Sequence, residues 1–420
     1  MRLRYIEAIK AYAGLLGLIT AFTIFFQFHL ALSGGLINLN LADPFALLAL
    51  VTLGISMVLS RTIPQWRFPD FNRILVLFGA LLLLAYVIGW MRIGNTQWAF
   101  SARIVGYAVL LGYLSSGYLL VAYIGNKGVR RLLEALATAA VLVIISTVVA
   151  RLLYGYGFDV PKPNPNFEGF SENRNAFAFQ LLAILALSLP YSKIYARQFV
   201  AKGERVYKAW RSWLPIGFMI TGILWSASRA GMLAVAIMLL VAYYKNALDR
   251  KSTLLGVLFA LLIWGMIWTA QIPLGKEVIQ SEISGEDSNN ERWTTLVYGI
   301  EMWRHSPFIG EGLGVFIANS SERFGHPTVI HNTPIWILAE FGFLGFVVFG
   351  WFYLKLWLYA VGVNSSGNSL ARAALLLLLI LFAVFSQFHE MLFQRVIWLI
   401  GGALLGSPLA LGSQSSTKAD

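Results

Sequence analysis

Long apolar runs separated by short loops constrain the fold of this chain more than any other feature. Each run approaches the ~20 residues with which a helix crosses a bilayer, where only a helix can satisfy its own backbone polar groups. Charged residues make up 12% of the chain, against about a quarter in soluble domains. The sequence therefore predicts an all-α membrane protein and excludes an ordinary soluble enzyme.

About twelve transmembrane helices are expected, with one large exterior loop that contains short helices. The expected spans are 11–30, 44–60, 73–92, 102–125, 130–154, 175–195, 211–227, 229–245, 252–271, 334–358, 370–388 and 391–411. Residues 1–271 then carry the first nine spans, 272–333 form the large loop, 334–412 carry the last three spans and 413–420 form a tail. Within the loop, apolar residues at helical spacing over 292–305 predict an amphipathic helix along the membrane surface.

The basic residues set the predicted orientation. The first span follows Met1-Arg2-Leu3-Arg4 without a small-residue cleavage site, which predicts an uncleaved anchor with its basic end in the cytoplasm. From there every second loop is basic, as in 61–73, 127–131, 193–211 and 245–251. This positive-inside pattern puts both termini in the cytoplasm and explains the net charge of +12 without a nucleic-acid partner. The absence of Cys excludes disulfides and thiolate metal sites.

The basic residues predicted to be exterior or embedded are nearly all arginine. Two lysines stand there against nine arginines, namely Arg92, Arg103, Arg151, Arg174, Arg229, Arg292, Arg304, Arg323 and Arg395. Arginine keeps its charge when it is desolvated and presents a planar fork to phosphate or carboxylate. Two interpretations stay open: a site for a phosphorylated, membrane-delivered substrate, or ion pairs with the acids of the same loops.

Three predicted helices begin at the exterior surface with anion-binding features. Arg174 opens one, Arg229 opens another, and Asn332 or Thr333 caps a third whose first turn contains Pro334. Helix N-termini attract anions through free N–H groups and the helix dipole. If these N-termini converge, they form a pocket for a diphosphate at the depth of the lipid headgroups.

His331 is the candidate general base, because an imidazole beside an anion pocket can take a proton from a hydroxyl group. The other histidines, His29, His305, His326 and His389, are interpreted as incidental. Glu340 lies inside the expected span 334–358, as its seventh residue, where we expect it to neutralise an arginine in a supporting role. No Asp-x-Asp pair is present to hold a divalent metal on a diphosphate, so we expect arginine to neutralise the leaving group without metal or cofactor.

Several short motifs occur together in a characteristic order. They are Ser226-Ala227-Ser228-Arg229-Ala230-Gly231, Arg292-Trp293, Trp303-x3-Pro307-x2-Gly310-x-Gly312-x-Gly314, His331-Asn332-x7-Glu340-x-Gly342-x2-Gly345 and His389-Glu390 before Trp398. In this order and spacing the chain resembles the bacterial O-antigen ligase and polymerase family over about 171–405.

The resemblance implies a polytopic glycosyltransferase of lipopolysaccharide biosynthesis, with its active site at the periplasmic face of the inner membrane. Its donor would be a glycan on undecaprenyl diphosphate, and a ligase would transfer that glycan to lipid A–core. The family's essential residues fall on His331, Arg229 and Arg292, whereas Arg174 and Asn332 are assigned to the diphosphate from their position.

Two alternatives stay open. An O-antigen polymerase would join one lipid-linked repeat to another, and it shares the motifs and the expected donor site. A transporter or flippase would use the spans and the embedded arginines without chemistry. No two-fold internal repeat is seen, and the motifs gather on one face, which favours the enzyme.

Overall fold

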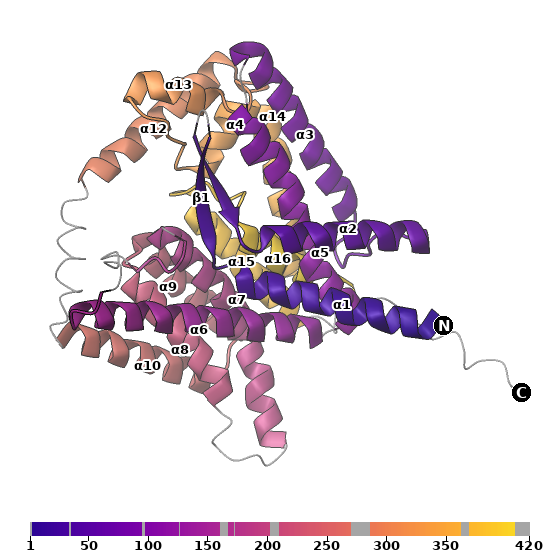
Figure 1. Cartoon of the computed structure of the whole chain (residues 1–420), viewed down its shortest axis with the longest axis vertical. Coiled ribbons are helices and arrows are strands. Elements are labelled where there is room, and N and C mark those ends of the chain that lie inside the picture. The colour runs from indigo at the N-terminus through magenta and orange to yellow at the C-terminus, as the bar shows by residue number, and fades with distance from the viewer. Residues whose placement is uncertain are drawn as a thin grey trace, which may run out of the picture.

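The computed structural model describes residues 2–32, 35–94, 97–125, 127–159, 167–171, 173–201, 210–269, 286–362 and 369–407, and these fold mainly into helices (Figure 1). The N-terminal half contains α1 (Arg2–Thr23), β1 (Gln27–Leu32), β2 (Gly35–Asn40), α2 (Asp43–Ser60), α3 (Phe71–Ile93), α4 (Gln97–Ala99), the π-helix η1 (Phe100–Val105), α5 (Gly106–Ile124), α6 (Lys127–Gly155) and α7 (Arg174–Ala201). The C-terminal half contains α8 (Trp210–Trp225), α9 (Arg229–Tyr244), α10 (Arg250–Thr269), α12 (Glu286–His305), α13 (Val315–Phe324), α14 (Thr333–Val361), α15 (Ser369–Ser386) and α16 (Arg395–Leu405).

The described helices confirm a helical, multi-pass membrane protein. Seven segments of the described chain are long and apolar enough to cross a bilayer: α2, α3, α4 through α5, α6, the first part of α7, α14 and α15. Shorter apolar helices include α8, α9 and α16. The count of twelve spans and the orientation stay predictions. Residues 272–285 of the expected large loop, and the tail 413–420, lie outside the described residues.

One of the predicted spans is wrong. The first span was expected over 11–30, but α1 ends at Thr23 and the chain continues into an antiparallel hairpin in which Gln27 pairs with Asn40. Apolar Phe28, Leu30 and Leu32 alternate with other residues, a period of two that favours a strand. The sequence Ser33-Gly34 between the strands is typical of a hairpin. The high hydropathy of the segment hid this alternation.

The centre of the helical bundle is α7, which packs against α8, α9 and α15. Residues 177–187 are buried without interruption, as expected for a helix that is apolar on every side. Close to it, α5 and α16 pack backbone to backbone, because a Cβ on Gly117 would lie 2.0 Å from the Leu399 carbonyl oxygen. Small residues permit this approach, as they do between other membrane helices, and it fixes the beginning of α16.

The glycine motif before α13 packs into a kink of α14. Gly342 interrupts α14 with φ of 67°, and the N–H of Phe343 donates to the Pro307 carbonyl at 2.8 Å. Gly310 has φ of 74°, and a Cβ there would lie 2.4 Å from the Glu340 carbonyl carbon. Positive φ and the lack of room both require glycine. The spacing Gly310-x-Gly312-x-Gly314 is therefore structural, and it anchors the segment that leads to α13.

Candidate active site

Two of the predicted anion-binding N-termini meet, since α7 and α9 begin side by side. Asn173 caps α7 by accepting from the N–H groups of Asn175 and Ala176 at 2.9 and 3.1 Å. Ser228 caps α9 through the N–H of Gly231 at 3.1 Å. The same hydroxyl donates to Asn175 Oδ1 at 2.7 Å, which ties the two helix starts together. Arg174 and Arg229, the first residues of these helices, are thereby brought to the same place.

The third N-terminus, that of α14, is joined to the segment between α15 and α16. Asn332 is its cap, as predicted, and accepts from the N–H of Ile335 at 3.0 Å. The Nδ2 of Asn332 donates to the Gln387 carbonyl at 3.0 Å, and the Thr333 hydroxyl donates to the His389 carbonyl at 2.7 Å. The Asn332 amide therefore positions the start of α14, and its role toward a diphosphate stays a prediction.

Arg174, Arg229 and Arg292 form one cationic cluster. Arg292 comes from α12, which confirms that the predicted segment 292–305 is helical, while its place along the membrane surface stays a prediction. Arg174 interacts electrostatically with both Arg229 and Arg292. Burial and then repulsion by Arg229 lower the pKa of Arg292 below its ordinary value. Like charges held together in a partly buried place favour an anionic ligand, because such a ligand removes their repulsion.

His331 lies against this cluster. Burial, followed by the nearby Arg292 guanidinium, lowers the pKa of His331 below 6.5, while Glu291 and Glu390 oppose the shift. The imidazole is therefore neutral at pH 7 and able to accept a proton. The structure thus brings together four of the five residues that the sequence analysis assigned to base and diphosphate, namely His331, Arg174, Arg229 and Arg292, and the fifth, Asn332, follows His331 in the chain.

A second histidine belongs to the same place. The ring of His389 lies 6.5 Å from that of His331, centroid to centroid, at an interplanar angle of 84°. Burial, then Arg292, lowers the pKa of His389 to about 3. The sequence analysis interpreted His389 as incidental. Its position before Glu390 in the C-terminal motif was the only signal that pointed to a site.

Glu291 holds the segment that carries His331. Its Oε1 accepts from the Thr328 hydroxyl at 2.9 Å and lies 3.2 Å from His326 Nε2. Burial alone would raise the pKa of Glu291, but the hydrogen bonds from His326 and Thr328 lower it. This carboxylate connects α12, next to Arg292, with the chain that runs into His331. It is a positioning group that the sequence analysis did not select.

Glu340 supports the site through hydrogen bonds and through one arginine. Its Oε2 accepts from Trp336 Nε1 at 2.7 Å, and its Oε1 accepts from the N–H of Gly314 at 3.1 Å. Arg103, which lines the cavity described below, interacts with it electrostatically. The hydrogen bonds also hold the glycine segment before α13 onto α14, a role that the sequence analysis did not predict.

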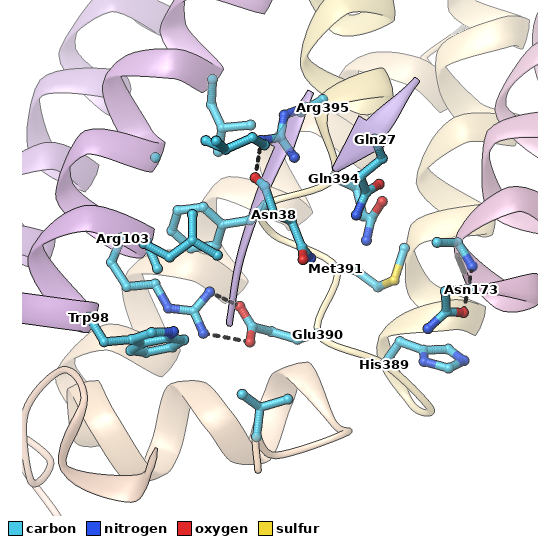
Figure 2. Close-up of a pocket in the computed structure, with 18 of the residues that line it drawn as sticks. Gln27, Asn38, Trp98, Arg103, Asn173, His389, Glu390, Met391, Gln394 and Arg395 are labelled. Carbon is cyan, nitrogen blue, oxygen red and sulfur yellow. Dashed lines mark hydrogen bonds and ion pairs between the residues drawn. The ribbon is translucent and has the colours of Figure 1, made fainter. Parts of the chain in front are cut away.

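Beside His331 and His389 lies a cavity of about 840 Å³. Its wall comes from the β1–β2 hairpin, η1, the segment between α15 and α16, and residues 327–331. Figure 2 shows Trp98 and Arg103 on one side of this cavity and Gln27 and Gln394 on the other. Among the described residues that line it, none belongs to the Arg174, Arg229 and Arg292 cluster. His331 therefore lines the cavity and also interacts electrostatically with Arg292 of the cluster.

Two buried arginine–carboxylate pairs line the cavity. Arg103 forms a bidentate pair with Glu390, with Nη2 to Oε2 at 2.6 Å, and its guanidinium lies 4.8 Å from the Trp98 ring centroid. Arg395 binds Asp43 through Nε at 2.7 Å and Nη2 at 2.9 Å. The sequence analysis did not select either acid. The two partners of each pair lie far apart in the sequence, so only the fold brings them together.

These pairs separate the two interpretations of the exterior arginines. Arg92 binds Glu311, and Arg323 binds Glu301 at 2.9 Å. Arg103 and Arg395 form the two cavity pairs described above. For these four arginines, pairing with acids accounts for the charge. Arg174 and Arg292 are each subject to repulsion by Arg229 and to attraction by an acid, Glu168 for Arg174 and Glu291 for Arg292, and an anionic ligand for this cluster stays a prediction.

An apolar groove of about 320 Å³ lies between α14, α15 and α16. One end is formed by Thr333, Pro334 and Gln387, close to the two histidines, and the other end reaches Leu405. Its lining is otherwise almost entirely apolar, with side chains such as Ile337, Phe346, Leu375 and Leu379. A single hydrocarbon chain fits such a groove, and its polar end would then lie near His331.

Comparison with known protein families gives one match, over part of the chain. The family model described as O-antigen ligase matches residues 214–350, a range that contains Arg229, Arg292, His331 and Glu340. It lies inside the 171–405 range over which the motifs showed the resemblance. No curated protein matches the chain.

Proposed function

From the membership of residues 214–350 in the O-antigen ligase family, we propose that this chain transfers a glycan from undecaprenyl diphosphate to a sugar hydroxyl of lipid A–core. The observation that carries the proposal is the position of His331 between a cationic cluster and a cavity. A glycosyl diphosphate donor needs an anion site at its leaving group, and an acceptor needs a base. This arrangement offers both at adjacent positions.

The proposed reaction is a direct displacement. Arg174, Arg229 and Arg292 bind the diphosphate through charge-assisted hydrogen bonds. His331 takes the proton of the acceptor hydroxyl while that oxygen bonds to the anomeric carbon. The bond from this carbon to the diphosphate oxygen breaks, and undecaprenyl diphosphate departs with the electron pair. A single displacement inverts the anomeric centre, and the three guanidinium groups stabilise the developing charge without metal.

The apolar groove supports a lipid-linked donor. Its polar end lies at Thr333 and Gln387, beside His331 and His389, and the remainder follows α14 and α15 along their length. A polyprenyl chain in this groove would place its diphosphate at the level of the cationic cluster. The placement agrees with a donor that never leaves the membrane and reacts at the periplasmic face of the inner membrane.

One experiment tests the proposal against its alternatives. Purified protein in detergent is given the lipid-linked glycan together with either lipid A–core or a second lipid-linked donor, and the products are separated by mass. We expect glycosylated lipid A–core. Lengthened lipid-linked glycan would identify a polymerase instead. If neither glycosidic product forms, while sealed vesicles with the protein move the lipid-linked glycan across the membrane, the protein is a transporter and the proposal is wrong.

A further inference from the structure

The cavity beside His331 is balanced in charge, unlike the cationic cluster. Its ionised lining residues are Asp43, Glu390, Arg103 and Arg395, and each acid is paired with one of the arginines. The two histidines at its edge have lowered pKa values and are neutral at pH 7. A balanced cavity gains nothing from an anion, so its ligand is polar and uncharged.

The remaining lining matches a polyhydroxyl compound. Amide and hydroxyl side chains supply both donors and acceptors; these are Gln27, Asn38, Asn173, Asn175, Gln394, Ser101, Ser321 and Thr328. Within the described part of the chain, the side chains of Gln27, Asn38 and Gln394 have no hydrogen-bond partner, so they are available to a ligand. The aromatic rings of Trp98 and Phe393 lie under the Arg103 guanidinium, 4.8 Å from each centroid, and so hold that side of the wall in place.

The wall is held rigidly by the hairpin. Arg395 Nη2 donates to the Asn38 carbonyl at 2.5 Å while the same guanidinium binds Asp43 (Figure 2). The Tyr113 hydroxyl donates to Asp43 Oδ1 at 2.8 Å, and the Asn40 N–H donates to Asp43 Oδ2 at 2.8 Å. Side chains fixed in this way form a preorganised surface, which is what selection among similar sugars requires.

The reaction geometry assigns this cavity to one of the two substrates. In a direct displacement the attacking hydroxyl approaches the anomeric carbon from the side opposite the leaving diphosphate. The diphosphate is assigned to the cluster, whose arginines do not line the cavity, and His331 contacts both regions. The attacking hydroxyl therefore comes from the cavity.

We propose that this cavity binds the terminal sugar of the acceptor, and that Asn38 and Gln394 on its wall determine which sugar is accepted. The assignment rests on the proposed function for its direction of attack, but its charge balance and lining do not depend on that function. The hairpin, η1 and the 386–395 segment all lie outside residues 214–350. The specificity surface is thus built from parts of the chain that the family model does not cover.

The test is a double variant, Asn38→Ala with Gln394→Ala, purified in the same detergent as the wild-type protein. Each substitution removes one neutral hydrogen bond to the sugar, so we expect KM for lipid A–core to rise about tenfold or more. KM for the lipid-linked donor should stay within twofold. Asn290→Ala, which removes an exposed amide on α12, is the matched control and should change neither value.

An unchanged KM for lipid A–core would overturn the proposal, and so would a rise confined to the donor. A binding measurement tests the cavity assignment independently of glycan transfer. The probe is the oligosaccharide released from lipid A–core by mild acid, followed by saturation-transfer NMR on the wild type and the double variant. If the wild type forms no glycosidic bond but binds this oligosaccharide, and the variant does not, the cavity assignment stands and the proposed function fails.

Discussion

The cationic cluster and the cavity meet at His331, yet like charges lie together in the cluster whereas opposite charges are paired in the cavity. In the cluster, Arg174, Arg229 and Arg292 repel one another. In the cavity, Arg103 and Arg395 are each neutralised by a buried acid. Arginine thus has two environments at the candidate site: in one, like charges lie together, and in the other, each guanidinium group faces a buried acid in the cavity wall. The number of arginines in a membrane protein therefore does not by itself measure its affinity for phosphate.

The largest expected effect concerns the residue that both regions share. His331→Ala should lower the rate of glycan transfer about 10²–10⁴-fold, because a positioned base contributes that much. The rate is measured with purified protein, and membrane insertion is checked by fractionation. His305→Ala removes an exposed imidazole at the end of α12 and serves as the control. Near-normal transfer by His331→Ala would break the link between the two regions.

The next largest effect distinguishes the positive charge of the cluster arginines from their bidentate hydrogen-bond geometry. Arg292→Lys keeps the positive charge but loses bidentate geometry, so we expect a loss of roughly 10²–10³-fold in kcat/KM for the donor. Arg229→Lys should behave alike. Arg304→Lys, an exposed position on the same helix as Arg292, should have no such effect. Unchanged donor affinity in both cluster variants would exclude the diphosphate site.

Stability should distinguish the two sets of arginines. Glu390→Gln leaves the buried Arg103 without its counterion, and breaking such a pair costs about 3–5 kcal/mol. Asp70→Asn breaks the exposed pair with Arg73 and should cost at most about 1 kcal/mol. Arg292→Gln removes a like charge from the cluster and should not lower the unfolding temperature. The measurement is thermal unfolding in detergent, and equal losses in all three variants would refute the contrast.

A smaller effect is expected in the pH profile. The pKa of His331 is lowered, so its neutral form should persist below pH 6.5 and the acid limb of kcat/KM should lie below that value. Glu291 opposes the shift, so Glu291→Gln should move the limb to still lower pH. An acid limb above 6.5 in the wild type would mean that the two acids, Glu291 and Glu390, outweigh burial and Arg292 at this imidazole, and it would contradict the prediction.

For removal of divalent metal ions we expect no effect on the rate of transfer. Incubation with EDTA should leave the rate of transfer by the purified protein unchanged, because three guanidinium groups already neutralise the diphosphate in the proposed reaction. A rate that falls with EDTA and returns with Mg²⁺ would show that the cluster alone is insufficient.

Sequence patterns predicted much of this molecule because they reflect local physics. Apolar runs predicted helices, and Asn332 with Pro334 predicted a capped helix start, since both depend on residues within one or two turns. The residue types at Arg229, Arg292 and His331 predicted an anion site with a base. The β1–β2 hairpin was missed because its residues are as apolar as those of a membrane span. In so short a segment, the high hydropathy is a stronger signal than the alternation of apolar residues.

The sequence by itself determined the helical membrane class, and it predicted the resemblance to the O-antigen ligase family and the residue types of the candidate site. Only the tertiary structure decided which arginines are neutralised, because Arg103 meets Glu390 and Asp43 meets Arg395 across most of the chain length. Only the fold places His389 beside His331 and encloses the cavity with a hairpin. The physical reason is that an electrostatic environment depends on distance in space, which the order of residues does not specify.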